Sequence, residues 1–138
     1  SIVLQEELAA IFPTIVPGIK RVKLRDGGDV TWNEYTVFHE LKLGTSELVI
    51  VTLDGDYAGF LVVTKAPTYL FVWVAYSDLT GVDIFDIALT QLEDLARDAG
   101  CNAIKFGTTR RGWEKVGKKH GFFAEEIRYS KRIYEQAR

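Results

Sequence analysis

An unbroken apolar run over residues 70–76 is the feature around which the rest of the chain can be arranged. A strand without polar alternation is typical of one that is buried on both faces, at the centre of a sheet covered by helices. A polar turn over residues 77–81 follows it. Apolar side chains then recur at three- and four-residue spacing up to Ala99, which predicts an amphipathic helix that ends before Gly100.

A second apolar run over residues 103–106 comes after this helix and predicts another strand. A helix that links two strands makes a β-α-β unit. We therefore expect these two strands to be parallel, with a right-handed crossover between them.

The N-terminal part of the chain predicts two helices. Residues 3–12 carry apolar positions on one helical face, and Pro13 and Pro17 are expected to end that helix. A short strand is expected over residues 21–24. A capping-box pattern that begins at Thr31 then predicts a second helix, which ends at a glycine, Gly44.

The middle and the end of the chain supply the remaining strands. Two β-branched and apolar runs, residues 48–53 and 57–64, flank an Asp-Gly-Asp turn and predict a hairpin. A short basic helix is expected to close at Gly121, and residues 123–134 alternate loosely, as a half-exposed edge strand does. The order of elements predicts an α/β fold, a mixed central sheet with helices on both faces.

Composition narrows the class of protein. The chain has 138 residues, which suits one domain over residues 1–138, and its net charge of −2 provides no global basic field for nucleic acid. A single cysteine, Cys101, rules out an internal disulfide framework and a cysteine-based metal site. We expect Cys101 to be a buried structural thiol and the protein to be cytoplasmic. Neither an apolar run of membrane-spanning length nor a signal-peptide pattern is present, so no membrane partner is expected.

From about Leu48 to Phe122 this order of elements resembles the core of the GCN5-related N-acetyltransferase (GNAT) fold. Two segments carry the resemblance most clearly: Leu92-Glu93-Asp94-Leu95-Ala96 with Ala99-Gly100, and Lys118-Lys119-His120-Gly121-Phe122. They resemble the long helix of the family and its final Lys-x-Gly-Phe signature. The resemblance implies acyl transfer from acetyl-CoA, a coenzyme A thioester, to an amine.

In that family the coenzyme lies in a V-shaped splay between the two parallel strands. Its pyrophosphate is bound by a glycine-rich loop that opens the long helix, because glycines allow close approach and the helix start favours negative charge. The resemblance implies a set of coenzyme-binding residues on the central strand, the following loop and the basic segment: Val74, Ala75, Tyr76, Thr80, Gly81, Val82, Arg110 and Arg111.

The loop departs from the family pattern at Asp83, which stands where a glycine is expected. A carboxylate in the first turn of a helix can accept the N–H groups that a phosphate would need. It would also repel a diphosphate by about 4 kcal/mol per charge pair at roughly 4 Å and an effective dielectric constant near 20. We therefore interpret Asp83 as an N-terminal helix cap that opposes coenzyme binding.

The catalytic groups depart from the pattern as well. Gly117 occupies the position of the tyrosine that protonates the leaving thiolate in many members, so Tyr76 or Tyr129 is the candidate acid. Asp78 or Glu40 is the candidate base. The spacing of the two histidines, His39 and His120, provides no metal-ligand motif, and no metal is expected.

Two other functions remain open. Residues 104–126 also resemble catalytically silent relatives among bacteriophage proteins, including an internal virion protein; this implies a binding or structural role, with a protein partner or a homo-oligomer, in the host cytoplasm or the virion. The basic residues from Arg110 to Lys119 could contact nucleic acid, but no aromatic ladder accompanies them, and this third reading is disfavoured.

Overall fold

The computed structural model describes residues 2–25, 33–79, 83–107, 117–126, 129, 131 and 133. Its elements, in chain order, are η1 (Gln5–Glu7), α1 (Leu8–Arg25), α2 (Glu34–Leu43), β1 (Ser46–Leu53), β2 (Asp56–Lys65), β3 (Tyr69–Ser77), α3 (Ile84–Asp98) and β4 (Ala103–Phe106).

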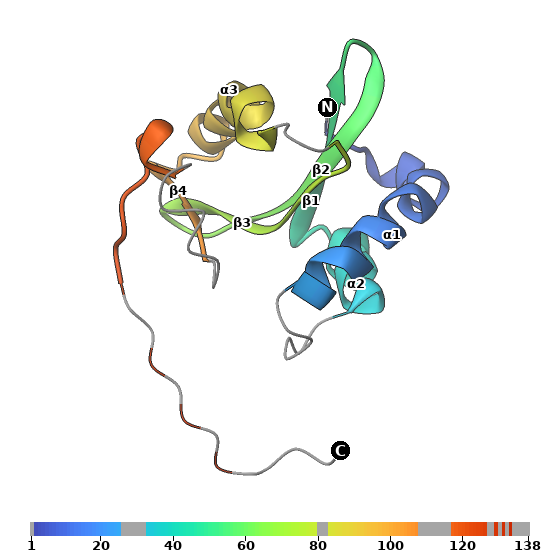
Figure 1. The fold of residues 1–138 in the computed structure, drawn as a ribbon, viewed down its shortest axis with the longest axis horizontal. Helices are drawn as coiled ribbons and strands as arrows, with labels where there is room; N and C mark the ends of the chain where they lie inside the picture. The colour runs from blue at the N-terminus through green and yellow to red at the C-terminus, as the bar shows by residue number, and fades with distance from the viewer. Residues whose placement is uncertain are drawn as a thin grey trace.

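The strands form a mixed four-stranded sheet in the order β1-β2-β3-β4. β1 pairs with β2 and β2 with β3 in antiparallel fashion, whereas β3 and β4 are parallel. Helix α3 lies on one face of the sheet, and α1 and α2 cover the other (Figure 1). The predicted hairpin, the parallel pair and the mixed sheet with helices on both faces are confirmed.

Each face of the sheet has its own hydrophobic cluster. One cluster joins the sheet to α3, where Phe85 and Leu92 are almost completely buried. The other joins the sheet to α1 and α2 through Ile15 and Ile19, both fully buried. The expectation that the central strand is buried from both sides is therefore confirmed, and Cys101 is buried as expected.

A β-bulge in β3 explains why this strand lacks polar alternation. Val62 pairs with Val74 but Val63 pairs with Val72, which leaves Trp73 as an extra residue on β3. Because side chains alternate between faces, one extra residue reverses which face each later position takes. Leu70 and Val72 accordingly pack in the cluster under α3, whereas Val74 and Tyr76 pack in the cluster under α1 and α2.

The N-terminal helix differs from the expectation. Pro13 and Pro17 do not end it but lie inside α1, and residues 21–24 are helical rather than a strand. Proline opposes a helix interior by roughly 3 kcal/mol. Here Ile15 and Ile19 continue the apolar stripe on the buried face, so that packing against the sheet outweighs the local preference.

The start of α2 also differs in detail. Thr31 lies outside the described residues, and the N-cap is Asn33, whose side chain accepts a hydrogen bond from the Thr36 N–H at 3.0 Å. Gly44 ends α2 with φ = 80°, as predicted. Asparagine is among the residues that the N-cap position prefers, because its side-chain oxygen accepts a first-turn N–H.

The predicted final strand is wrong for the part of it that the structure describes. Residues 123–126, 129, 131 and 133 form no strand, and the side chains of Phe123, Tyr129 and Ile133 are 82%, 88% and 85% exposed. Alternation tells which faces a strand would present, but a strand also needs the backbone groups of a neighbour. Of the basic helix, only residues 117–119 are described as helical.

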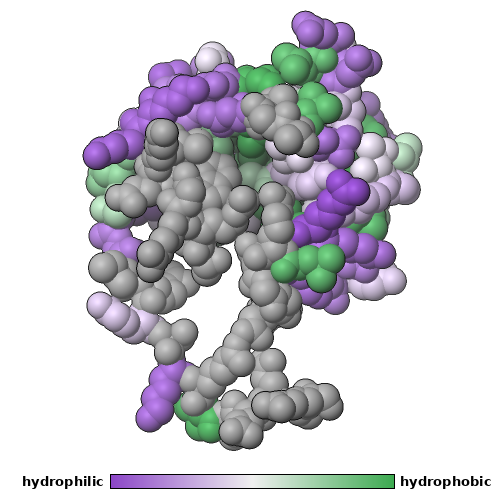
Figure 2. All heavy atoms as spheres, viewed as in Figure 1, coloured by the Kyte–Doolittle hydropathy of each residue, from purple (hydrophilic) through white to green (hydrophobic). Residues whose placement is uncertain are grey.

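The surface is largely polar where Figure 2 draws it in colour, and its hydrophobic residues form small separate areas. Scattered apolar residues of this kind are normal on a folded protein. Among the described residues, no helix combines the length and the apolar character that crossing a bilayer requires.

Candidate functional site

The parallel strands β3 and β4 share only a short ladder. It runs from the pair Tyr69 and Ala103 to the pair Val72 and Phe106. Beyond that point β3 continues to Ser77, still paired with β2, whereas β4 has ended. The bulge residue Trp73 is the first residue of β3 past the ladder, so the ladder ends where the bulge lies.

The candidate coenzyme-binding residues on β3 point in different directions. Val74 is 1% exposed and belongs to the cluster under α1 and α2, whereas Ala75 is half-buried against the cluster under α3. A ligand that lay along this part of β3 would therefore meet the main chain more than the Val74 side chain. The other members of that set, Thr80, Gly81, Val82, Arg110 and Arg111, lie outside the described residues.

The two candidate catalytic side chains, Tyr76 and Asp78, are brought together. The Tyr76 hydroxyl donates to Asp78 Oδ1 at 3.2 Å, and Arg21 Nη1 donates to the same hydroxyl oxygen at 2.9 Å. Burial, followed by electrostatic interaction with Asp78 and Tyr76, raises the pKa of Tyr57 to about 12, so Tyr57 keeps its proton. A phenol between a guanidinium and a carboxylate can hold a proton or pass it on.

Arg21 was missed by the sequence reasoning. Its segment was expected to form a strand, whereas the helix α1 carries it across the sheet to Tyr76. Continuing the apolar stripe of α1 through Ile15 and Ile19 was the signal that could have placed it.

Asp83 is the N-cap of α3, as predicted. Its Oδ1 accepts a hydrogen bond from the Phe85 N–H at 3.0 Å, and its main-chain oxygen accepts one from the Asp86 N–H at 3.1 Å. Its Oδ2 lies 2.7 Å from His120 Nε2 and 4.0 Å from Lys119 Nζ. Burial raises the pKa of Asp83. The hydrogen bonds from His120 and from the Phe85 N–H lower this pKa by more than burial raises it, so the net pKa lies below the ordinary value.

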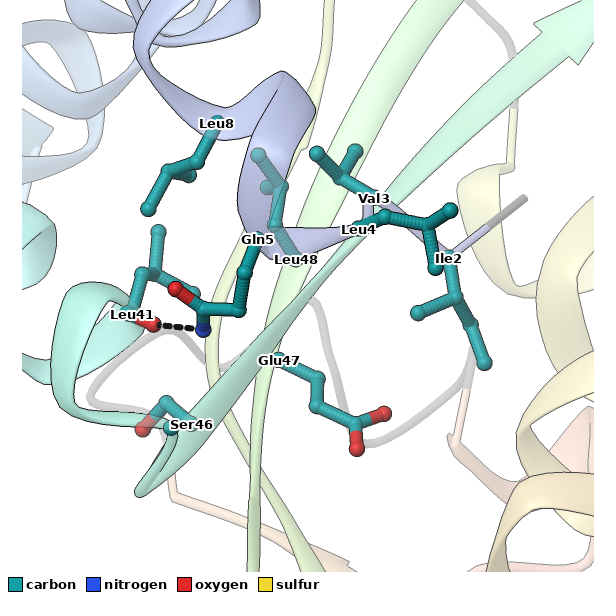
Figure 3. A pocket seen from close by; sticks show the side chains of 10 residues that line it. Ile2, Val3, Leu4, Gln5, Leu8, Leu41, Ser46, Glu47 and Leu48 are labelled. Atoms are coloured by element: carbon teal, nitrogen blue, oxygen red, sulfur yellow. Dashed lines mark hydrogen bonds between the residues drawn. The ribbon is translucent and has the colours of Figure 1, made fainter.

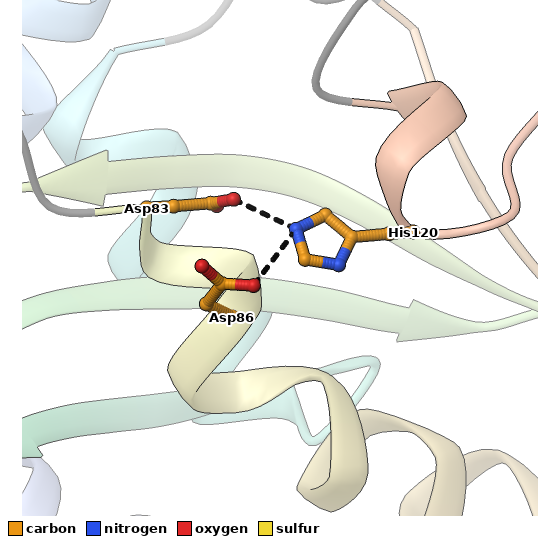
Figure 4. Close-up of side chains that lie close together, drawn as sticks. All are labelled: Asp83, Asp86 and His120. Carbon is orange, nitrogen blue, oxygen red and sulfur yellow. Dashed lines mark hydrogen bonds and ion pairs between the residues drawn. The ribbon is translucent and has the colours of Figure 1, made fainter.

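A second carboxylate completes this group, which we call the Asp83 cluster: Asp83, Asp86, Lys119 and His120. Asp86 Oδ2 lies 2.9 Å from Lys119 Nζ, and Asp86 Oδ1 lies 3.3 Å from His120 Nε2. The imidazole points from the segment before Gly121 straight at both carboxylates (Figure 4), and only 8% of its side chain is exposed. The cluster therefore fastens that segment to the first turn of α3.

The sequence reasoning did not find the cluster. His120 lies 37 positions from Asp83 in the chain. Helix periodicity says nothing about contacts at such a separation. The pair Lys119-His120 beside a glycine was the only local signal.

No protein-family model matches the chain, and no curated protein matches it in sequence. Solved structures do match. A ribosomal-protein-alanine N-acetyltransferase from Brucella melitensis biovar Abortus 2308 has a TM-score of 0.69 at 15% identity, and the match covers 96% of both chains. A predicted acetyltransferase with acetyl-CoA from Clostridium acetobutylicum also has a TM-score of 0.69, at 13% identity, over 96% of this chain and 94% of that one. An aminoglycoside acetyltransferase from an uncultured soil metagenomic sample has a TM-score of 0.67 at 12% identity, over 97% of both chains.

The chain has the GNAT fold. In this fold β3 and β4 are the parallel pair, and α3 is the long helix between them. At 12–15% identity, the likeness to these structures shows the fold alone.

The Asp83 cluster brings together three side chains of the kinds that bind metal ions. One ligand atom each from Asp83, Asp86 and His120 lie within 4.8 Å of one another, a donor set that zinc accepts. However, Lys119 already places a positive charge on both carboxylates, and the start of a helix carries partial positive charge. Both features compete with a cation for the two carboxylates, so the described surroundings do not favour a metal ion.

A pocket of about 220 Å³ lies at the far edge of the sheet, between the start of β1, η1 and the end of α2 (Figure 3). Gln5 Nε2 crosses it to donate to the Leu41 carbonyl at 2.6 Å. Glu47 Oε1 pairs with Lys65 at 2.8 Å, and Glu47 Oε2 is buried without a hydrogen-bond partner among the described residues. Because β1 and β4 are the opposite edges of the sheet, the pocket is separate from the end of the β3–β4 ladder.

Proposed function

We propose that this chain binds an acyl-coenzyme A, such as acetyl-CoA, beyond the end of the β3–β4 ladder and transfers the acyl group to an amine. The observation that carries the proposal is the end of the β3–β4 ladder at Val72 and Phe106, directly before the bulge at Trp73. A bulge bends a strand and re-aims its groups, and bulges are common next to active sites. The fold-level likeness to solved acetyltransferases supports the same reading.

The hydrogen-bonded side chains of Arg21, Tyr76 and Asp78 fit the chemistry of such a transfer. The amine nitrogen forms a bond to the thioester carbonyl carbon, and the carbon–sulfur bond breaks. Asp78 takes the proton released by the amine, through water, and the Tyr76 hydroxyl gives a proton to the departing thiolate. The 3.2 Å hydrogen bond between Tyr76 and Asp78 then returns the proton to the tyrosine, which restores both groups.

Coenzyme binding and transfer can be measured separately. Isothermal titration of the full chain with acetyl-CoA should show binding, and release of coenzyme A in the presence of a panel of primary amines should show transfer. Tyr76→Phe and Asp78→Asn should lower the transfer rate by about 10²-fold or more, the scale of a lost general acid or base. Tyr35→Phe, at a side chain 77% exposed on α2, is the matched control.

The result that would overturn the proposal is the absence of any binding or thermal stabilisation at a few millimolar acetyl-CoA, because a ligand of the folded state must raise its stability. Binding without transfer to any amine would leave only the first half of the proposal.

A second function is favoured by a specific observation, the capping of α3 by Asp83. The carboxylate occupies the first-turn N–H of Phe85 that a diphosphate would use, as expected for a GNAT-fold binding protein without activity. The resemblance to silent bacteriophage proteins belongs to this proposal and stays a prediction. This second function requires a surface for self-association or for a partner. A protein that sediments as a strict monomer and captures no partner in a pulldown from a host lysate would count against it.

A further inference from the structure

The C-terminal segment, residues 123–134, starts beside the outer edge of β4. Among the described strands β4 pairs only with β3, so no strand lies along its other edge there. The Phe122 ring, directly before the segment, lies 5.1 Å from the Phe106 ring. Three residues later, Glu125 Oε1 lies 2.7 Å from Lys105 Nζ. The residue numbers rise along the segment while they fall along β4, so the segment starts in the direction of an antiparallel strand.

The C-terminal segment exposes large apolar side chains. Phe123, Tyr129 and Ile133 are 82%, 88% and 85% exposed, and Figure 1 shows the described parts of the segment leading away from the sheet. Apolar side chains stabilise a fold only where they leave water. An extended segment outside any sheet is a template for pairing with another chain. The segment therefore has the character of a strand whose partner lies outside the monomer.

The charges of the C-terminal segment match its own sequence read in the opposite direction. Glu125 and Glu126 precede two basic residues, Lys131 and Arg132. Two copies of the segment can be laid antiparallel about an axis between positions 128 and 129. Glu126 then faces Lys131 of the second copy, and Glu125 faces Arg132. Opposite charges directly across an antiparallel pair stabilise it, and a two-fold axis makes each such pair occur twice.

We propose that the C-terminal segment is a dimerisation strand, which pairs antiparallel with the same segment of a second copy of this chain. In the register given above, Phe123 faces Tyr134. Ala124 faces Ile133, so apolar side chains also meet apolar partners. A shift of one residue in either direction leaves only one of the two glutamates opposite a basic residue. The charge pattern therefore selects this register.

The position of β4 supplies the rest of the interface. A ribbon of two strands is only marginally stable in water, so the paired segments need a third strand. The first half of each segment starts beside β4 of its own copy, and its other side is available to the second half of the partner's segment. The sheets of the two copies would then continue into each other through the paired segments. This interface does not depend on the proposed binding of acyl-coenzyme A.

Sedimentation equilibrium of the full chain should show a reversible dimer at micromolar concentrations. Glu126→Lys and Lys131→Glu should each raise the dissociation constant by about tenfold or more, because each turns two attractive pairs into two repulsive ones. High salt should weaken the wild-type dimer in the same direction. Glu6→Lys, at an exposed position of η1, is the matched control and should leave the dimer unchanged.

A mixture of the two charge variants tests the register. When Glu126→Lys pairs with Lys131→Glu, an acidic residue again faces a basic one at both places. The mixture should therefore dimerise about as tightly as the wild type, although neither variant does so alone. Both positions are exposed, and circular dichroism confirms that each variant keeps its fold. A mixture that dimerises no better than the single variants overturns the proposed pairing.

Two other results would overturn the dimerisation strand. One is a full chain that stays monomeric at high micromolar concentration, and the other is a dimer that survives deletion of residues 127–138. Titration of the same samples with acetyl-CoA measures the proposed function separately. Loss of the dimer with coenzyme binding intact refutes only the interface, and a dimer that binds no coenzyme refutes only the proposed function.

Discussion

Gly18→Ala sets helix propensity against packing at the place where α1 crosses the sheet. A Cβ at position 18 would lie 2.6 Å and 2.9 Å from Tyr76 ring carbons and 2.7 Å from Phe60 Cε1, well inside the ordinary contact distance of about 3.5–4.0 Å. Phe60 is fully buried and Tyr76 is 6% exposed, so neither ring has room to withdraw.

The two effects have opposite signs. Alanine favours a helix interior over glycine by about 1 kcal/mol. Overpacking of a closed core costs about 1–3 kcal/mol, and three contacts shorter than 3.0 Å on two buried rings place this site at the upper end. We expect a net loss of about 2 kcal/mol in the free energy of unfolding, which lowers Tm by roughly 6–8 °C for a domain of this size.

Urea unfolding followed by circular dichroism measures this value. Ala10→Gly, at an exposed position of the same helix, measures propensity alone and should lose about 1 kcal/mol. A Gly18→Ala variant that is as stable as the wild type, or more stable, would falsify the claim that α1 is seated on these two rings.

Three further predictions concern the stability of the folded chain around β3 and α3. Gly59→Ala should destabilise by at least 2 kcal/mol, because a Cβ there would lie 2.1 Å from the Tyr76 carbonyl oxygen, whereas Gly107→Ala meets nothing within 4 Å and should be neutral in the same urea titration. Phe85→Ala should cost about 3–5 kcal/mol, because this 1%-exposed ring also contacts the Phe106 and Phe122 rings; a loss below 1 kcal/mol would contradict the packing under α3. Because the pKa of Asp83 is lowered in the folded protein, the stability that it contributes is complete above its unfolded pKa of about 3.9 and is lost as pH falls through the lower folded value. Asp83→Asn should therefore flatten the fall in urea midpoint below about pH 4, and an unchanged acid profile would refute the linkage.

The parts of the fold that depend on local pattern could be predicted from the sequence. The spacing of Phe85, Leu92 and their neighbours fixes which side of α3 is apolar, and Asp83 and Gly100 mark its two ends. The hairpin follows from its Asp-Gly turn, and the parallel pair follows from the helix between two strands.

The parts that depend on distant contacts could not be predicted. The prediction from sequence ended the first helix at Pro13 and Pro17. In the structure the burial of Ile15 and Ile19 outweighs the cost of the two prolines, and the helix continues. The pairings of His120 with Asp83 and of Arg21 with Tyr76 join segments 37 and 55 positions apart. No spacing rule connects such residues, because the sheet that brings them together must first be known.

Because of the bulge at Trp73, β3 packs its first half against α3 and its second half against α1 and α2. Substitutions at Val72 should loosen the seat of α3, and substitutions at Val74, two positions along, should loosen that of α1. Removing the single extra residue would turn Val74 and Tyr76 to the face that α3 covers. The side chains that alternate with them would then face α1. An insertion or deletion of one residue at this position would therefore require the hydrophobic clusters on both faces of the sheet to repack together.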